Sequence, residues 1–467
     1  MEIIEKLKNN KDKMPDLQIR DIKYKNKTLY VFNLQSVSSS EQANDFILKY
    51  LSKKSFSKNI LNQIKEEIYN YIPSVSLVDI KEDEVFNYLF NGFTILIYEE
   101  NILAFETKAN LDRGVTEPTS EPTIKGPKDS FNENYNTNLG LIRKRIKSEN
   151  LYIEDHIIGT ETNTKVSLIY MENLVDKELL ENVKIHLDKI QTDMILDIYY
   201  IKELLDKENK TMFPTVKITE KPDLATKNIL EGKIIIMCEN SNNVMIIPTF
   251  FLDFFFSDED NFQKKAFANF AKIIRILAFF VSIFAPAIYL SLITYDQQML
   301  PTSLLINFAT QRQSVPFPAI IEAAVLIFTF EILYEGDALT PPSRGTALSI
   351  LGALVLGDAA VNAGVVSPIM VIVIAISAIC SLFFIYYDVQ SFFRVYRYAL
   401  MILASIAGMI GIIIGFVFMM TNLCSVKSFG KPFMLPLSPK LNIKNRKKLI
   451  KKGLIAQNTY KGEIWKK

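Results

Sequence analysis

The first half of the chain alternates short apolar runs with polar stretches, a pattern that predicts a folded soluble region. Residues 1–26 are mostly charged and polar, so we expect a flexible N-terminal arm there. Residues 27–112 are expected to form one α/β subdomain, because strand-like and helix-like patterns follow one another. The expected elements are strands at Thr28–Asn33, Phe93–Tyr98 and Ile102–Glu106, and helices at 38–51 and Lys58–Tyr69.

Residues 151–249 repeat this alternation and predict a second α/β subdomain. Such an order of elements favours a mixed or parallel sheet with helices packed against it. The expected elements are strands at Val166–Met171, Lys233–Met237 and Val244–Ile247, a helix at Asp176–Ile190, and a helix or strand around Ile195–Leu205.

Residues 113–150 form a linker between the two subdomains, and its first part is rich in proline. Prolines lack an N–H and move the preceding residue out of the α region, so Glu117 and Glu121 cannot share a helix face. A long loop of this kind is usually functional. Two interpretations stay open, a charged relay or subunit contact and a stiff inter-domain loop held by ion pairs. The charged residues in question are Glu117, Glu121, Lys125, Lys128, Arg143 and Arg145.

The second half of the chain is strongly apolar. Residues 250–270 begin with FFLDFFF next to acidic residues and predict an aromatic membrane-interface segment. Residues 271–420 are expected to be a transmembrane domain, because a run of about 20 apolar residues can cross a bilayer as a helix. The candidate spans are Ala271–Thr294, Phe317–Tyr334, Gly345–Gly364, Val365–Tyr386 and Tyr398–Met420, with Ser367 as N-cap and Pro368 as first residue of the fourth helix.

Charge is distributed unevenly, although the formal net charge is only +2. Residues 421–467 carry 12 Lys and Arg against one acidic residue, which predicts a basic cytoplasmic tail. Because the first residues hold no signal-peptide pattern, the head is expected in the cytoplasm as well. An even number of crossings then excludes one candidate. We expect the segment 317–334, which carries Glu322 and Glu331, to be the one that does not cross the membrane, rather than the segment 345–364. The tail is expected to bind anionic lipid or only to fix topology, and not nucleic acid.

Catalytic chemistry is poorly represented. His156 and His186 are the only histidines, and the three cysteines lie far apart in the sequence. No nucleophile, base and orienting group occur at a familiar spacing, and no glycine-rich phosphate loop follows a strand. We therefore expect no enzyme, no cofactor and no metal site.

The linker also carries the most specific motif of the chain. The run RGVTEPTSEPTIKGPKDSFNENYNTNLGLIRKRI, residues 113–146, resembles the motif of the GerA family of spore germination proteins. Further stretches at 219–236, 250–262, 300–323 and 349–373 resemble the same family, although Lys125 and Lys221 stand where arginine is usual. The family residues matched in the linker are Glu117, Pro118, Glu121, Gly126, Pro127, Asn138 and Arg143.

The resemblance implies the A subunit of a nutrient-germinant receptor in the spore inner membrane. It implies that the chain acts together with a transporter-like B subunit and a lipoprotein C subunit. It also implies that the A subunits form an oligomeric, pentameric, nutrient-gated ion channel. A stage V sporulation relative of AF type shares these motifs and stays an alternative. A secondary transporter or a scaffold subunit is a further alternative.

The span at 345–364 is the candidate pore helix. Helical geometry places Leu351, Val355, Asp358 and Asn362 on one face. Apolar rings can close a pore by dewetting, and a carboxylate ring favours cations. A packed bundle in which Asp358 is simply hydrogen-bonded is the equal alternative.

Overall fold

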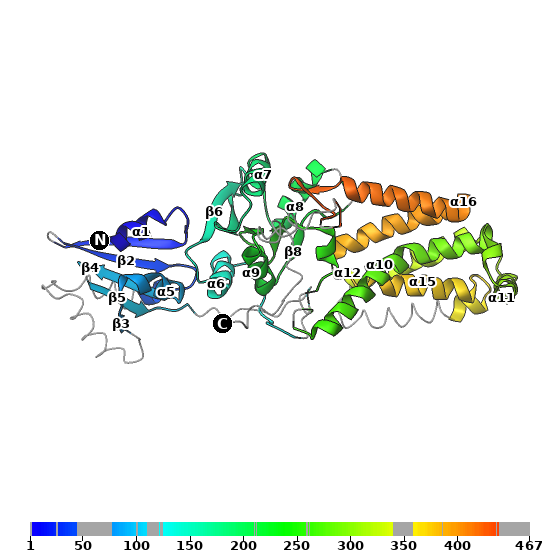
Figure 1. Ribbon diagram of the computed structural model, residues 1–467, viewed down its shortest axis with the longest axis horizontal. Coiled ribbons are helices and arrows are strands. Elements are labelled where there is room, and N and C mark those ends of the chain that lie inside the picture. Colours follow the sequence, from blue (N-terminus) through cyan, green and yellow to red (C-terminus); the bar gives the residue numbers. More distant parts are fainter. Residues whose placement is uncertain are drawn as a thin grey trace.

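The computed structural model describes residues 2–24, 27–43, 77–99, 101–109, 121, 125–209, 211, 213–257, 260, 262–339, 358–384, 386–435 and 437–438. Two α/β subdomains and a domain of long helices follow one another along the long axis (Figure 1). The expected fold class, a two-part α/β head before a domain of apolar helices, is confirmed. The helix expected at 58–69 lies outside the described residues. Of the helix expected at 38–51, only α2 (Ser40–Ala43) is described.

Subdomain 1 is a five-stranded antiparallel sheet with strand order β1-β2-β4-β5-β3. Helices α1 and α5 share one apolar core with the sheet. The expected hairpin is confirmed, with Tyr98 paired to Asn101 across its turn. The elements are α1 (Glu2–Asn9), β1 (Leu17–Tyr24), β2 (Lys27–Leu34), β3 (Leu77–Asp79), the 3-10 turn Glu82–Glu84, α5 (Val85–Phe90), β4 (Phe93–Tyr98) and β5 (Asn101–Glu106).

The expected flexible arm at residues 1–26 is wrong. Helix α1 buries Ile3 and Leu7, which are four residues apart and therefore lie on one helix face. Strand β1 pairs with β2 from Leu17 to Tyr24 over its full length. Most of the charged residues of this segment, apart from the buried Asp16, occupy exposed or half-exposed positions, so its composition concealed a folded element of the core.

Subdomain 2 is a second five-stranded sheet, with order β6-β7-β9-β10-β8. All its strand pairs are antiparallel, so the expectation of a mixed or parallel sheet is wrong. The turns between β6 and β7 and between β9 and β10 are short, and short turns join antiparallel strands only. The strands are β6 (Leu151–Ile158), β7 (Thr164–Met171), β8 (Lys217–Thr219), β9 (Ile234–Cys238) and β10 (Val244–Ile247).

Helices cover both faces of this second sheet. Neighbouring strand residues alternate between two cores, so that Leu168 packs with α7 and α8 while Ile169 packs with α6 and α9. The region around 195–205, left open as helix or strand, is helical. The helices are α6 (Tyr135–Arg145), α7 (Lys177–Asp188), α8 (Ile198–Asn209) and α9 (Pro222–Leu230).

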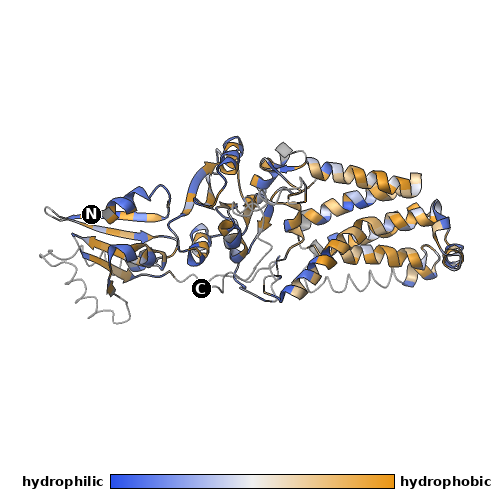
Figure 2. Cartoon of the chain, viewed as in Figure 1, coloured by the Kyte–Doolittle hydropathy of each residue, from blue (hydrophilic) through white to orange (hydrophobic). Residues whose placement is uncertain are grey.

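The helical domain lies at the opposite end of the molecule from subdomain 1, and most residues of its helices are hydrophobic (Figures 1 and 2). We call its end beside subdomain 2 the head end and the opposite end, which carries α11, the far end. Pro368 begins α15 after the N-cap Ser367, as predicted. The elements are α10 (Lys265–Thr294), the 3-10 turn Gln297–Met299, α11 (Thr302–Arg312), α12 (Ala319–Leu339), α14 (Ala360–Asn362), α15 (Pro368–Ser381) and α16 (Tyr387–Ser425).

Helix α16 reverses direction within itself, so the expected single span at 398–420 is wrong. Gly408 has φ 60° and ψ −140°, which is not helical, and divides α16 into a first arm (387–407) and a second arm (409–425). The Asn422 amide donates a hydrogen bond of 2.8 Å to the Tyr396 hydroxyl. In a straight helix these residues would be roughly 39 Å apart. The two arms therefore form a helical hairpin.

The second arm ends beside subdomain 2 and the chain then folds onto the head. Strands β11 (Lys427–Ser428) and β12 (Lys431–Pro432) pair antiparallel. The Ser428 hydroxyl donates to the Thr215 carbonyl at 2.7 Å, and the Thr249 N–H donates to the Ser428 hydroxyl at 3.2 Å. The first part of the expected tail, 421–467, is thus packed onto subdomain 2. Its basic cluster at 444–452 lies outside the described residues.

The phenylalanine run at 250–256 packs largely into the core instead of standing out as an aromatic anchor, while the membrane-interface position expected for 250–270 stays a prediction. Phe254 and Phe255 are buried, in and directly after the 3-10 turn Phe251–Phe254, and the Phe255 ring lies 5.3 Å from that of Phe279 in α10. Two described acidic residues of this segment, Asp253 and Asp260, have partners inside the protein. Lys233 pairs with Asp253 at 2.7 Å, and Arg275 with Asp260 at 2.7 Å. The segment joins the sheet of subdomain 2 to α10.

Candidate functional site

We call the linker residues 113–146 the strap; the structure describes residues 121 and 125–146 of it. The strap contacts subdomain 1, subdomain 2 and the segment that leads into α10. Glu121 is buried against subdomain 2. Its backbone N–H donates to the Glu220 carboxylate at 2.9 Å, and its own carboxylate accepts from the Thr219 hydroxyl and the Glu220 N–H. Glu117 and Pro118 lie outside the described residues.

Gly126 connects the strap with the segment before α10. Its φ of +113° is a conformation that only glycine adopts readily. An added Cβ would lie 2.7 Å from the Phe262 ring. The neighbouring Pro127 is exposed. Both the conformation and the close ring therefore require glycine at this position.

Asn138 lies in α6 and ties the strap to itself and to subdomain 2. Its side-chain amide donates to the carbonyl groups of Asn132 and Ser241, and its oxygen accepts from the Asn132 N–H at 2.8 Å. One turn earlier, the Tyr135 hydroxyl is 2.8 Å from Ser167. Burial, together with the nearby Asp155 carboxylate, raises the pKa of Tyr135, so this hydroxyl stays neutral.

Arg143 joins subdomain 2 to subdomain 1 and is fully buried. Its guanidinium donates to both oxygens of Asp16, at 2.9 and 2.8 Å, and the Ser36 hydroxyl donates to the same carboxylate. Its Cζ also lies 5.6 Å from the centre of the Phe90 ring. Sequence reasoning missed Asp16, because this residue lies in the segment expected to be a loose arm. The structure thus gives Arg143, Asn138 and Glu121 contacts that hold the bodies together.

Two of the three glutamates of α12, Glu322 and Glu331, are placed inside the helical domain. Glu331 accepts from Arg397 at 2.7 Å and lies 3.0 Å from Arg394, both in the first arm of α16. Glu322 is fully buried and accepts from the Ser367 N–H at 2.6 Å. These bonds explain how a helix with two internal carboxylates packs among apolar neighbours.

The candidate pore face is described only in part. Leu351 and Val355 lie outside the described residues. Asp358 and Asn362 are exposed, and the Asn362 amide donates to the Asp358 carboxylate at 2.8 Å. The expectation that these two residues share a helix face agrees with that bond. Their role in a pore stays a prediction.

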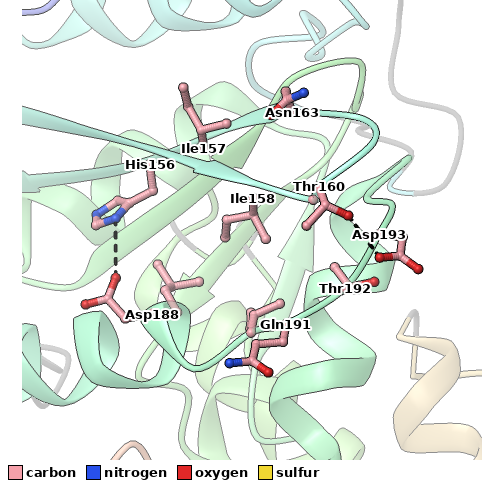
Figure 3. A pocket seen from close by; sticks show the side chains of 12 residues that line it. His156, Ile157, Ile158, Thr160, Asn163, Asp188, Gln191, Thr192 and Asp193 are labelled. Atoms are coloured by element: carbon pink, nitrogen blue, oxygen red, sulfur yellow. Dashed lines mark hydrogen bonds and ion pairs between the residues drawn. The ribbon is translucent and has the colours of Figure 1, made fainter.

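A cavity of about 890 Å³ opens in subdomain 2 between the β6–β7 turn and the end of α7 (Figure 3). His156 lies 3.8 Å from Asp188, and the Thr160 hydroxyl donates to Asp193 at 2.9 Å. The first contact ties β6 to the end of α7, and the second ties the β6–β7 turn to the residues after α7.

The chain was compared with known proteins. Residues 5–461 match the family described as Bacillus/Clostridium GerA spore germination protein. Spore germination protein KA of Bacillus subtilis is 39% identical over 359 residues, which are 76% of this chain and 66% of the relative. The membrane protein YfkQ of Bacillus subtilis, itself uncharacterized, is 33% identical over 416 residues, 88% of this chain and 80% of the relative.

Spore germination protein XA of Bacillus anthracis is 32% identical over 359 residues, 76% of this chain and 73% of the relative. A crystal structure of the N-terminal domain of the A subunit of the Bacillus megaterium spore germinant receptor GerK3 is 26% identical, with a TM-score of 0.41. It covers 53% of this chain and 94% of that domain.

The two-part head, the strap and the apolar helices define a membrane-associated protein with a soluble α/β head. The chain belongs to the GerA family of spore germination proteins.

Proposed function

We propose that the chain is the membrane subunit of a nutrient-germinant receptor and assembles as an oligomeric, ligand-gated ion channel. Family membership supports the receptor role. The main support for the channel proposal is a set of charged side chains inside the helical domain. Glu322 and the Glu331–Arg397 pair lie there among apolar helices. Ionisable groups inside a membrane domain usually mark an ion path or its gate.

The proposed location is the spore inner membrane, with head and tail in the cytoplasm. Two features support it. The chain enters α10 at the head end, and the second arm of α16 returns to the head end. Five candidate spans gave an odd number of crossings, which was the reason for excluding one of them. Because the two arms of α16 replace the last candidate by two crossings, the total becomes even and no candidate has to be excluded. A multi-pass arrangement is therefore part of the proposal.

The proposed partners are a transporter-like B subunit, a lipoprotein C subunit, the lipid bilayer and further copies of this chain in a pentamer. The proposed working units are the two subdomains, the strap, the helical domain and the basic end of the chain. In this scheme the strap passes movement of the head to α10 through Gly126 and Phe262.

The decisive experiment measures ion flux through the purified full-length protein in liposomes. We expect cation flux, more resting leak in Val355→Ala and less cation flux in Asp358→Asn. Thr329→Ala is the matched control, because Thr329 is exposed and bonds only within its own helix, to Val325. If the wild-type protein assembles in the bilayer and carries no ions, the channel proposal fails and a scaffold role replaces it. If Val355→Ala and Asp358→Asn behave as wild type, the pore lies elsewhere.

A further inference from the structure

Four helices bring polar side chains together at the far end of the helical domain. They are Tyr289 of α10, Arg312 at the end of α11, Glu322 of α12 and Ser367, the N-cap of α15. One oxygen of Glu322 accepts both the N–H (2.6 Å) and the hydroxyl of Ser367. Glu322 thus places a carboxylate on the N-cap N–H of α15, at the helix end where the dipole favours negative charge.

Three other buried polar atoms of this cluster form no hydrogen bond of regular geometry. The second oxygen of Glu322 lies 3.8 Å from the Arg312 Nε, which is too long for a hydrogen bond, and neither atom bonds to another group. The third atom is the buried Tyr289 hydroxyl, which lies beside Ser367. Buried polar atoms without partners are uncommon in folded proteins. One acceptor and one donor at this spacing fit a bridging water, which typically forms about three bonds.

The cluster also fixes the end of the candidate pore segment. Gly364 has φ +66°, and a Cβ there would lie 3.1 Å from the Ser314 carbonyl oxygen in the turn between α11 and α12. Three residues later, Ser367 is held by Glu322. Residues 358–367, which comprise the end of the pore segment and its connection to α15, therefore contact the far ends of α11 and α12.

We propose that Glu322 is a positioning residue for the pore segment and acts as a hydrated latch. In the latched state one oxygen holds Ser367 and a water connects the other oxygen to Arg312. In the released state Glu322 forms a direct ion pair with Arg312, which requires an approach of about 1 Å, and Ser367 is freed. This inference rests on the proposed channel function.

The first test uses Glu322→Gln, which keeps the shape and removes the charge, in the full-length protein in liposomes. We expect the Ser367 amide to exchange hydrogen at least about tenfold faster, because a neutral amide oxygen is a weaker acceptor. Resting cation leak should rise by a similar factor. Thr329→Ala on the same helix should change neither quantity. If amide exchange and leak in Glu322→Gln both equal those of the wild type, the latch is overturned.

Arg312→Gln separates a latch from a merely structural cluster. The substitution removes the direct Glu322–Arg312 ion pair of the released state and therefore destabilises that state more than the latched one. Hydrogen exchange at the Ser367 amide should then be as slow as in the wild type, or slower. A structural role predicts faster exchange in both variants, and that result would overturn the latch. The two proposals are also distinguishable. If the wild-type protein shows no ion flux but the Ser367 amide still exchanges faster in Glu322→Gln, the channel proposal fails and the contact between Glu322 and Ser367 stands.

Discussion

At the scale of single residues, the Arg143–Asp16 pair is the contact most sensitive to substitution. Both side chains are almost fully buried. Arg143→Met should lower the free energy of unfolding by about 3–5 kcal/mol, because it leaves the Asp16 charge buried and unpaired. Arg145→Met is the matched control on the same helix, since the Arg145–Asp129 pair is partly exposed and should cost about 0–1 kcal/mol.

The cause of the loss can be separated from the loss of volume. Asp16→Asn in the Arg143→Met background removes the unpaired charge and should recover part of the stability. Denaturant unfolding of the full-length protein in detergent measures all four proteins. Equal losses in Arg143→Met and Arg145→Met would mean that burial of the first pair has no special weight.

Asp296 gives a prediction with a defined pH dependence. It lies in the turn after α10, accepts from the Ser291 hydroxyl, and accepts from the Met409 N–H at 2.9 Å, the first residue of the second arm of α16. These bonds lower the pKa of Asp296. A lowered folded-state pKa means that the stabilisation is present above the unfolded value of about 3.9 and is lost as pH falls below it.

Asp296→Asn should therefore lower the melting temperature at pH 7, and the difference from wild type should shrink as the pH falls toward 3. Thermal unfolding across pH 3–7 measures this, with Thr294→Val as the control because the Thr294 hydroxyl bonds only within α10. A difference that is constant across the range would exclude the carboxylate charge as the cause.

At the scale of elements, the helical hairpin of α16 makes a direct distance prediction. Cysteines at Tyr396 and Asn422, in a chain with Cys380 and Cys424 replaced by serine, should be joined by a short bifunctional thiol reagent. A cysteine pair at 396 and 413 serves as the negative control. Cross-linking of both pairs or of neither contradicts the hairpin.

The reversal itself should depend on glycine at one position. Gly408→Ala places a Cβ 2.7 Å from the Asp296 carboxylate and requires φ 60° with ψ −140° from a residue that has a side chain. We expect a loss of about 1–3 kcal/mol in the free energy of unfolding. Ser405→Ala, at an exposed position in the first arm, should change stability little.

Local signals in the sequence predicted local elements well. The turn at 99–101 between two apolar runs predicted the β4–β5 hairpin, and Ser367-Pro368 predicted the start of α15. The hairpin of α16 could not be predicted, because Gly408, Gly411 and Gly415 all interrupt one apolar run and only the packing shows which of them reverses the chain.

The candidate site was predicted as a segment but not as a set of contacts. The motif identified Glu121, Asn138 and Arg143, yet the partner of Arg143 lies 127 residues away in sequence. No local pattern encodes such a distance. The antiparallel order of the second sheet was missed for a related reason, since helices between strands occur in both sheet types and only the pairing decides.

At the scale of the whole molecule, the β11–β12 hairpin fastens the last helix to the head. Phe429 is buried in the core of subdomain 2, and Lys431 pairs with Glu178 at 2.9 Å and Asp176 at 3.5 Å, both at the start of α7. Lys431→Glu should repel both carboxylates and speed amide exchange in α7. Lys427→Glu, exposed in the same hairpin, should not. Similar amide exchange of α7 in the two variants would show that the contact of Lys431 with Glu178 and Asp176 does not stabilise α7.

This fastening has a mechanical consequence. Subdomain 2 holds both ends of the helical domain: Lys233 pairs with Asp253 where the chain enters, and Phe429 and Lys431 pack against and pair with subdomain 2 where it leaves. The Phe213 ring of subdomain 2 also lies 4.1 Å from the Phe392 ring in the first arm of α16. Because the first and the last helix are both fastened to subdomain 2, a movement of this subdomain would displace both helices together.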